Sequence, residues 1–551
     1  MKMKTFFSAA LAMLTLASCS KNDGPEMNLS SAQDKAYLAL SIQLPQSVGT
    51  KAAGDPSSIT ATAEESTLKS VWLLGFDGKA TTSKLVMKKA VTTEVGLSTS
   101  TGAAANQTAQ AIGVVDGLQT IFLVANPMPE ALKQIEGLTE GASTYADMNK
   151  AVQESDLATA NGYMMVCAGS VVGGADDLGL VDVSNKIVRI GENIQGITVT
   201  DAATALQAIQ ANNKEKMVTV NLERVLAKVK LNLANGGTYT KAGLFSASVK
   251  GYALNTTNKS FFPYSPIETQ YENLNMTATP ATVYRQDPNY ANLEMDPTGS
   301  GSAADNAMLA FNWLTNKAAV TWTSTNDEML CLENTMGSTD AENYNNSTKV
   351  LFRVEVTPEV EGNALAAGED FFMVEGKAYS FDGLVAYYKT LNDATARQKM
   401  NNFFKVNGRD DKIWFSTELP SASITKEEIE AFEDASYKVA QAVGTANETS
   451  VKYYKGGICY YTTTIAHDGR LDTGKIGRWG VVRNNIYTMD VKAIEGIGLP
   501  YVPDPTDPSI KDPVNPKPSD PETNDEPDEA FIAVDVVINP WTSWTQDVTL
   551  K

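Results

Sequence analysis

The chain has very little histidine, little cysteine and a shortage of basic residues. Its 551 residues include one histidine and four cysteines, and 45 lysines and arginines stand against 65 acidic residues, for a net charge of -20. A single imidazole disfavours histidine-rich metal centres and catalysis by several histidines. An acidic surplus disfavours binding to phosphate backbones. The composition therefore argues against a histidine-based enzyme and against a nucleic-acid partner.

The common motifs of catalysis are missing as well. The sequence has no G-x-S-x-G, H-E-x-x-H or phosphate-loop pattern, so it lacks the usual signatures of a serine hydrolase, a zinc protease and a nucleotide-binding enzyme. The one histidine, His467, precedes Asp468-Gly469, a hairpin signal, and we expect it to be a turn residue. We expect no catalytic residue, no cofactor and no metal site, and hence no enzyme.

The cysteines are few and widely spaced. Beyond Cys19, the chain contains only Cys167, Cys331 and Cys459, an odd number with no C-x-x-C pair. This pattern fits neither a disulfide framework nor a zinc site. We expect three buried free thiols.

The N-terminus carries an apolar run that is too short to cross a membrane. Residues 6–16 are apolar after two lysines, whereas a membrane span needs about 20 residues. The run ends in Leu16-Ala17-Ser18-Cys19, which resembles a bacterial lipobox. We therefore predict a lipoprotein signal peptide over residues 1–18 and a lipidated Cys19 whose acyl chains anchor the precursor. The alternative is an ordinary signal peptide that ends near a cysteine.

The body of the chain has the pattern of short β-strands. Residues 35–44 alternate in polarity, which predicts one strand with a buried face; its apolar residues are Ala36, Leu38, Leu40, Ile42 and Leu44. Val71–Asp77 and Thr120–Ala125 are mostly apolar and predict central, two-sided strands, the first of which ends in the turn signal Asp77-Gly78. Alternation changes parity around Arg224, which indicates a bulge or a strand that passes between two sheets. We place a domain boundary there.

Helices are expected to be few. Thr425 to Glu428 form a capping box, and the apolar spacing after it predicts a helix that stops at Gly444. Residues 384–391 and 127–138 also have helical spacing. The predicted fold class is mainly β, with two antiparallel β-sandwich domains and short helical insertions.

The C-terminus differs from the rest of the chain. Residues 500–529 hold 9 of the 22 prolines, and nine acids against two lysines give them a charge of -7, which predicts a stiff, extended linker. The tail that follows, residues 530–551, alternates again. Its apolar residues, proposed to fill a groove, are Ile532, Val534, Val536, Ile538, Trp541 and Trp544.

These two strands suggest a mechanism of assembly. The segment after the first strand is small and polar, and a cut between Lys51 and Ala52 would release that strand and open an apolar groove. The tail of another subunit would fill the groove by donor-strand complementation. Such a contact is heterologous and does not close, so it generates a filament. The alternative is that the tail folds back as an edge strand of its own chain, and periodicity alone does not separate the two.

Several motifs, in their order, resemble the fimbrillin family that builds type V pili in Bacteroidales, and within it the shaft subunit of short (minor) fimbriae. The segments that carry this resemblance are the lipobox, VWLLGFD at 71–77, IFLVANP at 121–127, VNLERVLAKVKL at 220–231, LEN at 332–334 with TKVLFRVEVTP at 348–358, RNNIY at 483–487, Ile497-Gly498, the linker and VDVVINPW at 534–541.

The resemblance implies transthyretin-like, Greek-key sandwiches, lipid-anchored transport to the cell outer membrane, and removal of the first strand by a trypsin-like protease. It then implies polymerisation with identical subunits and with anchor and tip subunits into an extracellular fimbrium that adheres to host or bacterial surfaces. Cys19 matches the lipidated position and Lys51 the cleavage residue, although the family often has arginine there.

The implied organisation comprises a signal peptide (1–18), a propeptide with the first strand (19–51), two β-sandwich domains (52–225 and 226–499), the linker (500–529) and the donor strand segment (530–551). The alternatives are a fimbrial tip or accessory adhesin, which accepts a donor strand but donates none, and a monomeric glycan-binding surface lipoprotein with a flat aromatic platform.

Overall fold

The computed structural model describes most of the chain between the first strand and the tail. The residues that it describes are 35–44, 64–95, 106–107, 110–157, 162–169, 177–271, 284–291, 293, 306–314, 320–337, 346–360, 363–409, 425–432, 435–468, 471, 475–502 and 532–540. Within these ranges, no helix is long and apolar enough to cross a membrane.

The N-terminal half is built on an eight-stranded sheet in the order β4-β3-β7-β9-β14-β2-β5, with β10 beside β7. Its strands are β2 (Leu40–Gln43), β3 (Val71–Phe76), β4 (Leu85–Ala90), β5 (Asn106–Gln107), β7 (Thr120–Ala125), β9 (Met165–Cys167), β10 (Val181–Asp182) and β14 (Val218–Arg224). The strands β3 and β7 lie in the interior of this sheet, and every residue of β7 is buried. The two all-apolar segments are therefore central strands, as predicted.

A smaller sheet and three helices complete this half. The three-stranded sheet has the order β11-β1-β6, from β1 (Lys35–Leu38), β6 (Ile112–Val115) and β11 (Val188–Arg189). The helices are α1 (Pro129–Gly137), α2 (Tyr145–Met148) and α3 (Ala202–Asn212). The pairs β12 (Asn193–Ile194) with β13 (Ile197–Thr198) and β8 (Val152–Gln153) with β19 (Ser260–Phe261) are short. The sequence predicted α1 but not α3.

The C-terminal half contains two larger sheets. One has the order β21-β15-β28-β29, from β15 (Leu226–Leu233), β21 (Met329–Leu332), β28 (Asn485–Ile494) and β29 (Ile532–Pro540). The other has the order β16-β17-β22-β23 with β27 beside β22, from β16 (Thr238–Lys241), β17 (Phe245–Asn255), β22 (Lys349–Val360), β23 (Asn363–Ala364) and β27 (Ile458–Thr464). A minor pair joins β18 (Thr257–Asn258) to β20 (Phe311–Asn312), next to the short helix α4 (Ala307–Ala310).

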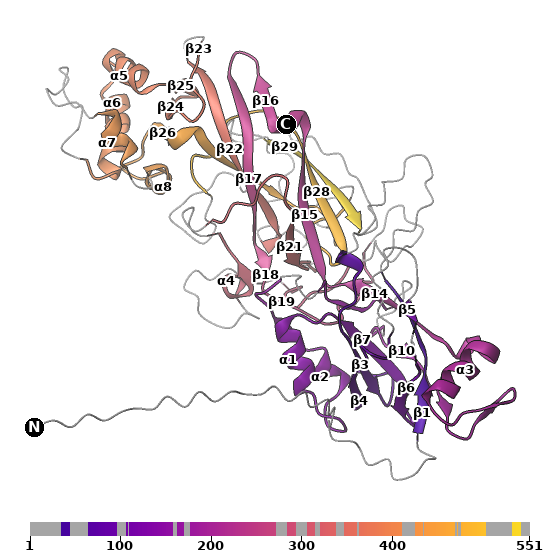
Figure 1. Cartoon of the computed structure of the whole chain (residues 1–551). Helices are drawn as coiled ribbons and strands as arrows, with labels where there is room; N and C mark the ends of the chain where they lie inside the picture. The colour runs from indigo at the N-terminus through magenta and orange to yellow at the C-terminus, as the bar shows by residue number, and fades with distance from the viewer. Residues whose placement is uncertain are drawn as a thin grey trace, which may run out of the picture.

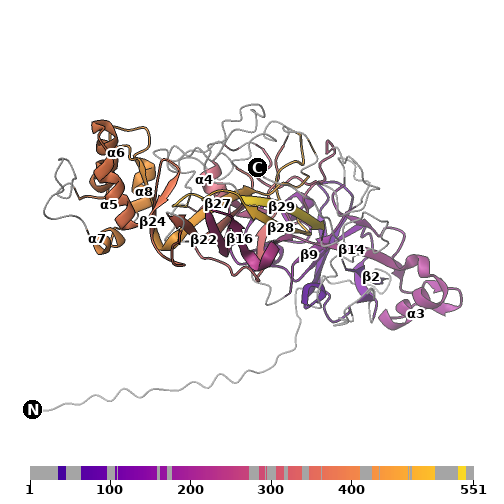
Figure 2. The ribbon, with the colours of Figure 1, turned by 90° about the horizontal axis from the view of Figure 1, so that it is seen from above.

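A helical insertion lies at one end of the molecule, and β1 and α3 lie at the other end (Figures 1 and 2). The insertion combines the sheet β25-β24-β26 with four helices that share their own apolar core. Its elements are β24 (Phe371–Val374), β25 (Lys377–Tyr379), β26 (Val451–Tyr454), α5 (Phe381–Thr390), α6 (Ala394–Val406), α7 (Lys426–Glu430) and α8 (Ala435–Gln441).

The chain passes from one sheet to another next to Arg224, as the change of parity predicted. The strand β14 ends at Arg224 in the eight-stranded sheet, and β15 begins at Leu226 in the sheet of β28. The main N-terminal core includes Leu226, whereas Ala227 belongs to the C-terminal core. A domain boundary at residues 225/226, with sandwich domains over 52–225 and 226–499, remains our proposal.

The structure confirms a mainly β fold, while the Greek-key sandwich detail remains a prediction. One helix differs from expectation: the segment that starts at Thr425 forms the two short helices α7 and α8. Thr425 does form the predicted capping box with Glu428. The spacing suggested one helix because side chains from both helices face the same core, among them Ile429 and Val439.

Candidate strand-exchange site

The first strand is buried inside the N-terminal half. Its five predicted core residues, Ala36, Leu38, Leu40, Ile42 and Leu44, are between 0% and 9% exposed and all belong to one apolar cluster. Burial of this kind contributes about 25 cal/mol per Å² of apolar surface. The strand is therefore part of the core, and its removal would open an apolar groove.

This strand has neighbours on both sides at residues 36–37 and 41–42. The strand β1 lies between β11 and β6, with Tyr37 opposite both Val188 and Gly113. The strand β2 lies between β14, which runs parallel to it, and β5, with Ser41 opposite both Thr219 and Gln107. The first strand thus satisfies the backbone hydrogen bonds of four other strands.

Ala39 marks the point where the first strand leaves one sheet and joins the other. Its carbonyl accepts the backbone N–H of Val218 at 3.0 Å. Its side chain is fully buried and belongs to a second apolar cluster on the opposite face, together with Ala111, Ala205 and Ala208. The last two come from α3. The cluster also contains larger side chains, among them Val188, Leu206 and Ile209. The sequence alone did not indicate this second face.

The tail lies as an edge strand of its own chain. The strand β29 pairs antiparallel with β28 from Asn485↔Pro540 to Ile494↔Ile532, with one irregularity after Val491 (Figure 2). On its other side β29 has no partner among the strands that the structure describes. The alternative of a tail that folds back in cis therefore describes this conformation, and the donor role remains a proposal.

Several predicted positions lie outside the described residues. These are Cys19, Lys51, Ala52, Trp541, Trp544 and most of the linker. Tyr501 and Val502, at the start of the predicted linker, are buried.

Buried ion pairs hold the region between the two cores. Arg483, which precedes β28, pairs with Glu333 at 3.0 Å between side chains that are fully buried. It also donates to the carbonyls of Pro263 at 3.0 Å and Phe262 at 2.7 Å. The guanidinium thus connects the segment in front of β28 to two other parts of the chain. Charge-assisted bonds of this kind are stronger than neutral ones.

A second buried pair lies in β14. Arg285 contacts Glu223 at 2.7 Å and donates to the carbonyl of Ser265 at 2.7 Å. Burial raises the pKa of Glu223, and the positive charges of Arg285 and Arg483 oppose that rise only in part. Burial also raises the pKa of Asp287 to about 7. Sequence reasoning missed these charges because charged side chains are normally exposed.

A third cluster anchors the chain just after the predicted propeptide. The carbonyl of Glu65 accepts two bonds from the guanidinium of Arg224, at 3.0 and 2.8 Å. The Glu65 carboxylate pairs with Lys228, which also pairs with Glu328 at 2.6 Å. Glu65 is 4% exposed. A chain cut at Lys51 would therefore remain fastened at Glu65.

His467 and the three cysteines of the body of the chain are buried. His467 lies in a bend, as expected, but it is 7% exposed, and its Nδ1 is 2.9 Å from the Tyr487 hydroxyl. The predicted free thiols Cys167, Cys331 and Cys459 are buried, and burial raises the pKa of each to about 12. Within the described ranges, no three His, Cys, Asp or Glu side chains group as metal ligands would.

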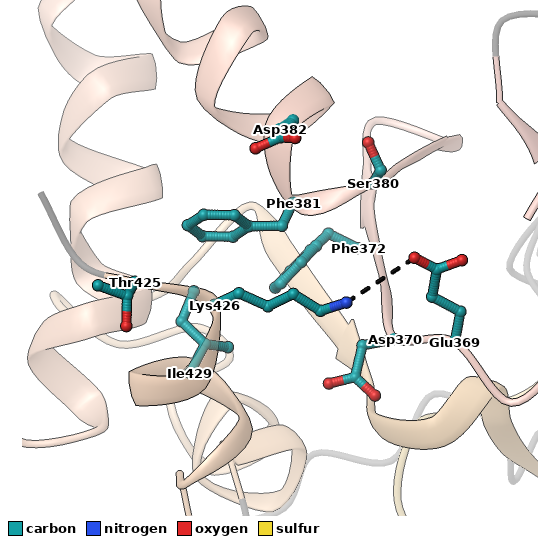
Figure 3. A pocket seen from close by; sticks show the side chains of 9 residues that line it. All are labelled: Glu369, Asp370, Phe372, Ser380, Phe381, Asp382, Thr425, Lys426 and Ile429. Carbon is teal, nitrogen blue, oxygen red and sulfur yellow. Dashed lines mark ion pairs between the residues drawn. The ribbon is translucent and has the colours of Figure 1, made fainter.

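A cavity of about 380 Å³ lies in the helical insertion (Figure 3). Lys426, at the start of α7, extends across it and pairs with Glu369 at 3.8 Å. Of the two rings in its wall, Phe372 is 2% exposed and Phe381 is half-buried. This cavity does not present the flat aromatic platform expected of a glycan-binding lipoprotein.

Comparison with known proteins finds a similarity in the C-terminal region. Residues 452–547 match the family model "Major fimbrial subunit protein type IV, Fimbrillin, C-terminal", a span that contains β28 and β29. No curated protein sequence matches the chain.

Two solved structures illustrate the similarity. A fimbrilin from Porphyromonas gingivalis W83 is 13% identical with a TM-score of 0.35, over 94% of this chain and 100% of that one. The tip fimbrial protein Mfa3 from Porphyromonas gingivalis, with a C-terminal truncation, is 11% identical with a TM-score of 0.29, over 91% of this chain and 99% of that one.

Proposed function

We propose, on the premise that residues 452–547 are the C-terminal region of a fimbrillin, that this chain is a shaft subunit of a type V fimbrium. The family match supports a fimbrial structural or adhesin subunit. The observation that supports the shaft role is that the first strand and the tail strand have similar sequences but different surroundings. The first strand is buried between neighbours on both sides, and the tail strand β29 lies at an edge.

Maturation removes the first strand and leaves the rest of the fold fastened. A cut between Lys51 and Ala52 frees residues 19–51 with β1 and β2. The chain from Glu65 onward stays tied to Arg224 and Lys228 by buried charged groups. The vacated groove exposes apolar surface and the backbone edges of four strands, which only another strand satisfies.

The tail of a second subunit fills this groove. In cis the tail pairs with one strand, whereas in the groove it pairs on both sides with the former partners of β1 and β2. The gain in hydrogen bonds and buried apolar surface favours transfer. Each subunit accepts one strand and donates one, so the chain grows as a filament.

The precursor reaches the surface through the lipid on Cys19. Several acyl chains anchor a protein without a transmembrane helix. A Cys19→Ser precursor is expected to lose incorporation of radiolabelled palmitate and to leave the outer-membrane fraction. Incorporation at the normal level would contradict lipidation at this position.

The decisive experiment treats purified precursor briefly with trypsin and follows its size by chromatography and electron microscopy. We expect filaments from the intact chain, monomers from a chain without residues 530–551, and no assembly of Lys51→Ala. The matched control is Lys69→Ala, which removes a lysine on the other side of the predicted cut and should assemble normally. Cut chains that stay monomeric, or that polymerise without the tail, would contradict the mechanism.

The rival role as a tip or accessory adhesin makes a different prediction in the same assay. A tip subunit accepts a donor strand but donates none, so cut chains would cap filaments and would not extend them. The tail strand with its alternating apolar residues favours the shaft role. Anchor and tip subunits, and a host or bacterial surface receptor, are the further partners of this proposal.

A further inference from the structure

The tail resembles the first strand position by position, except that Ser41 and Gln43 meet Asp535 and Val537. Residues 36–44 read Ala-Tyr-Leu-Ala-Leu-Ser-Ile-Gln-Leu, and residues 530–538 read Ala-Phe-Ile-Ala-Val-Asp-Val-Val-Ile. At a constant offset of 494 (530 minus 36), both alanines coincide and an aromatic residue meets an aromatic one. The four larger aliphatic residues of the buried face meet aliphatic ones, and Ser41 meets Asp535.

The position of Ala39 limits the size of the side chain that a donor strand can place there. The side chain at this position is fully buried, in an apolar cluster that also contains Ala205 and Ala208 of α3. A larger side chain there would overpack a closed site. Within β29 the only alanine is Ala533, and the offset of 494 brings it to the position of Ala39 (533 minus 39).

Other registers place a charged or a large residue at the position of Ala39, which we call the small site. A shift of two residues in one direction brings Asp535 to the position of Ala39, and a shift in the other direction brings Phe531 there. A shift of one residue turns the whole apolar set to the other face. A strand that runs in the opposite direction with Ala533 in the small site puts Asp528 at the position of Leu44.

Asp535 would meet different neighbours in cis and in the groove. In cis its Cα pairs with that of Asp490, and like charges directly opposite each other are destabilising. In the groove it would take the position of Ser41, opposite Gln107 and Thr219. Ser41 itself is 7% exposed, whereas Thr219 and Gln43, two residues further along the strand, are exposed.

We infer that the donor strand enters the groove in the direction of the displaced strand and in a single register, with Ala533 in the site of Ala39. This inference rests on the proposed donor-strand function and adds its specificity-determining residue. Ala533 selects the register because it is the residue of β29 that the α3 side of the groove admits.

Disulfide trapping tests the register directly. Ser41 and Gln107 are Cα partners in the precursor, so a donor in this register brings residue 535 opposite residue 107 of the next subunit. Full-length Gln107→Cys/Asp535→Cys, cut by trypsin and oxidised, should give a covalent ladder on a non-reducing gel. The matched control, Gln107→Cys/Val537→Cys, should give none. The three native thiols are buried and do not interfere, and cleavage removes Cys19.

A size test is independent of the cysteines. Ala533→Leu should slow filament growth about tenfold, because the larger side chain overpacks the position of Ala39. Val537→Leu, at the position of the exposed Gln43, should change growth less than about twofold. Filaments that crosslink through residue 537 or through neither pair, or that tolerate Ala533→Leu, would overturn the register but not strand donation. A wild-type cut chain that forms no filaments would overturn the proposed function itself.

Discussion

The first strand and the tail strand have similar sequences but opposite environments. The first strand, β1 with β2, is buried on one face and in part on the other and has a neighbour on each side, whereas β29 has β28 as its one neighbour among the described strands. In the proposed mechanism either strand occupies the same groove, and covalent continuity keeps the first strand in place until the cut.

The segment next to β28, which holds Arg483, should contribute much more to the free energy of unfolding than β29 does. Replacing Arg483, next to β28, by Met leaves the carboxylate of Glu333 buried without its partner, which costs about 3–5 kcal/mol. We expect Arg483→Met to lower the free energy of unfolding by that amount, as measured by urea titration of the precursor with tryptophan fluorescence. The control, Lys241→Met, removes an exposed pair with Glu495 and should change the value by less than about 1 kcal/mol.

The second largest effect is expected from lost packing in the first strand, which should destabilise the precursor more than loss of the tail strand does. Leu40→Ala in the precursor is expected to cost about 2–5 kcal/mol, because Leu40 is fully buried. Deletion of residues 530–551 should cost less in the same urea titration. After cleavage and release of the first strand, Leu40→Ala should assemble like wild type. A tail deletion that destabilises the precursor as much as Leu40→Ala would break the comparison.

A smaller loss of stability is expected from a larger side chain at Ala39 in the groove. Ala39→Leu forces a larger side chain against α3 and should cost the precursor about 1–3 kcal/mol. The same change at the exposed Gln43, Gln43→Leu, serves as its control. Thermal unfolding followed by circular dichroism measures both, and equal melting temperatures would show that the α3 side of the groove is not closed.

The charge pair in cis should give the smallest effect. Asp535→Asn removes the repulsion from Asp490 and should stabilise the docked tail by about 0.2–1 kcal/mol. We expect slower exchange of the β28 amides against deuterium and a modestly longer lag before filaments form. Asp525→Asn, which removes the same charge from the linker, should change neither. A shorter lag for Asp535→Asn would mean that Asp490 does not oppose the tail.

The sequence predicted the strands that matter better than it predicted their surroundings. The alternation at Ala36 to Leu44 indicated the buried face correctly because the period of two is a local property. The second face at Ala39 could not be read, since it depends on α3, more than 150 residues further along the chain. The change of parity located the passage at Arg224 but gave no sign that this arginine is fully buried. Burial of a charge depends on partners such as Glu65 that lie far away in sequence.

The anchor at Glu65 has a mechanical consequence. Glu65 contacts Arg224 in β14 and Lys228 in β15, so it bridges the sheets of the two halves. In the proposed filament, tension would enter a subunit through the groove in one half and leave through the other half. The load would therefore cross the covalent passage from β14 to β15, the apolar core around Leu226 and these buried, charge-assisted contacts. A shaft built in this way would resist stretching up to a threshold and then yield abruptly at the junction.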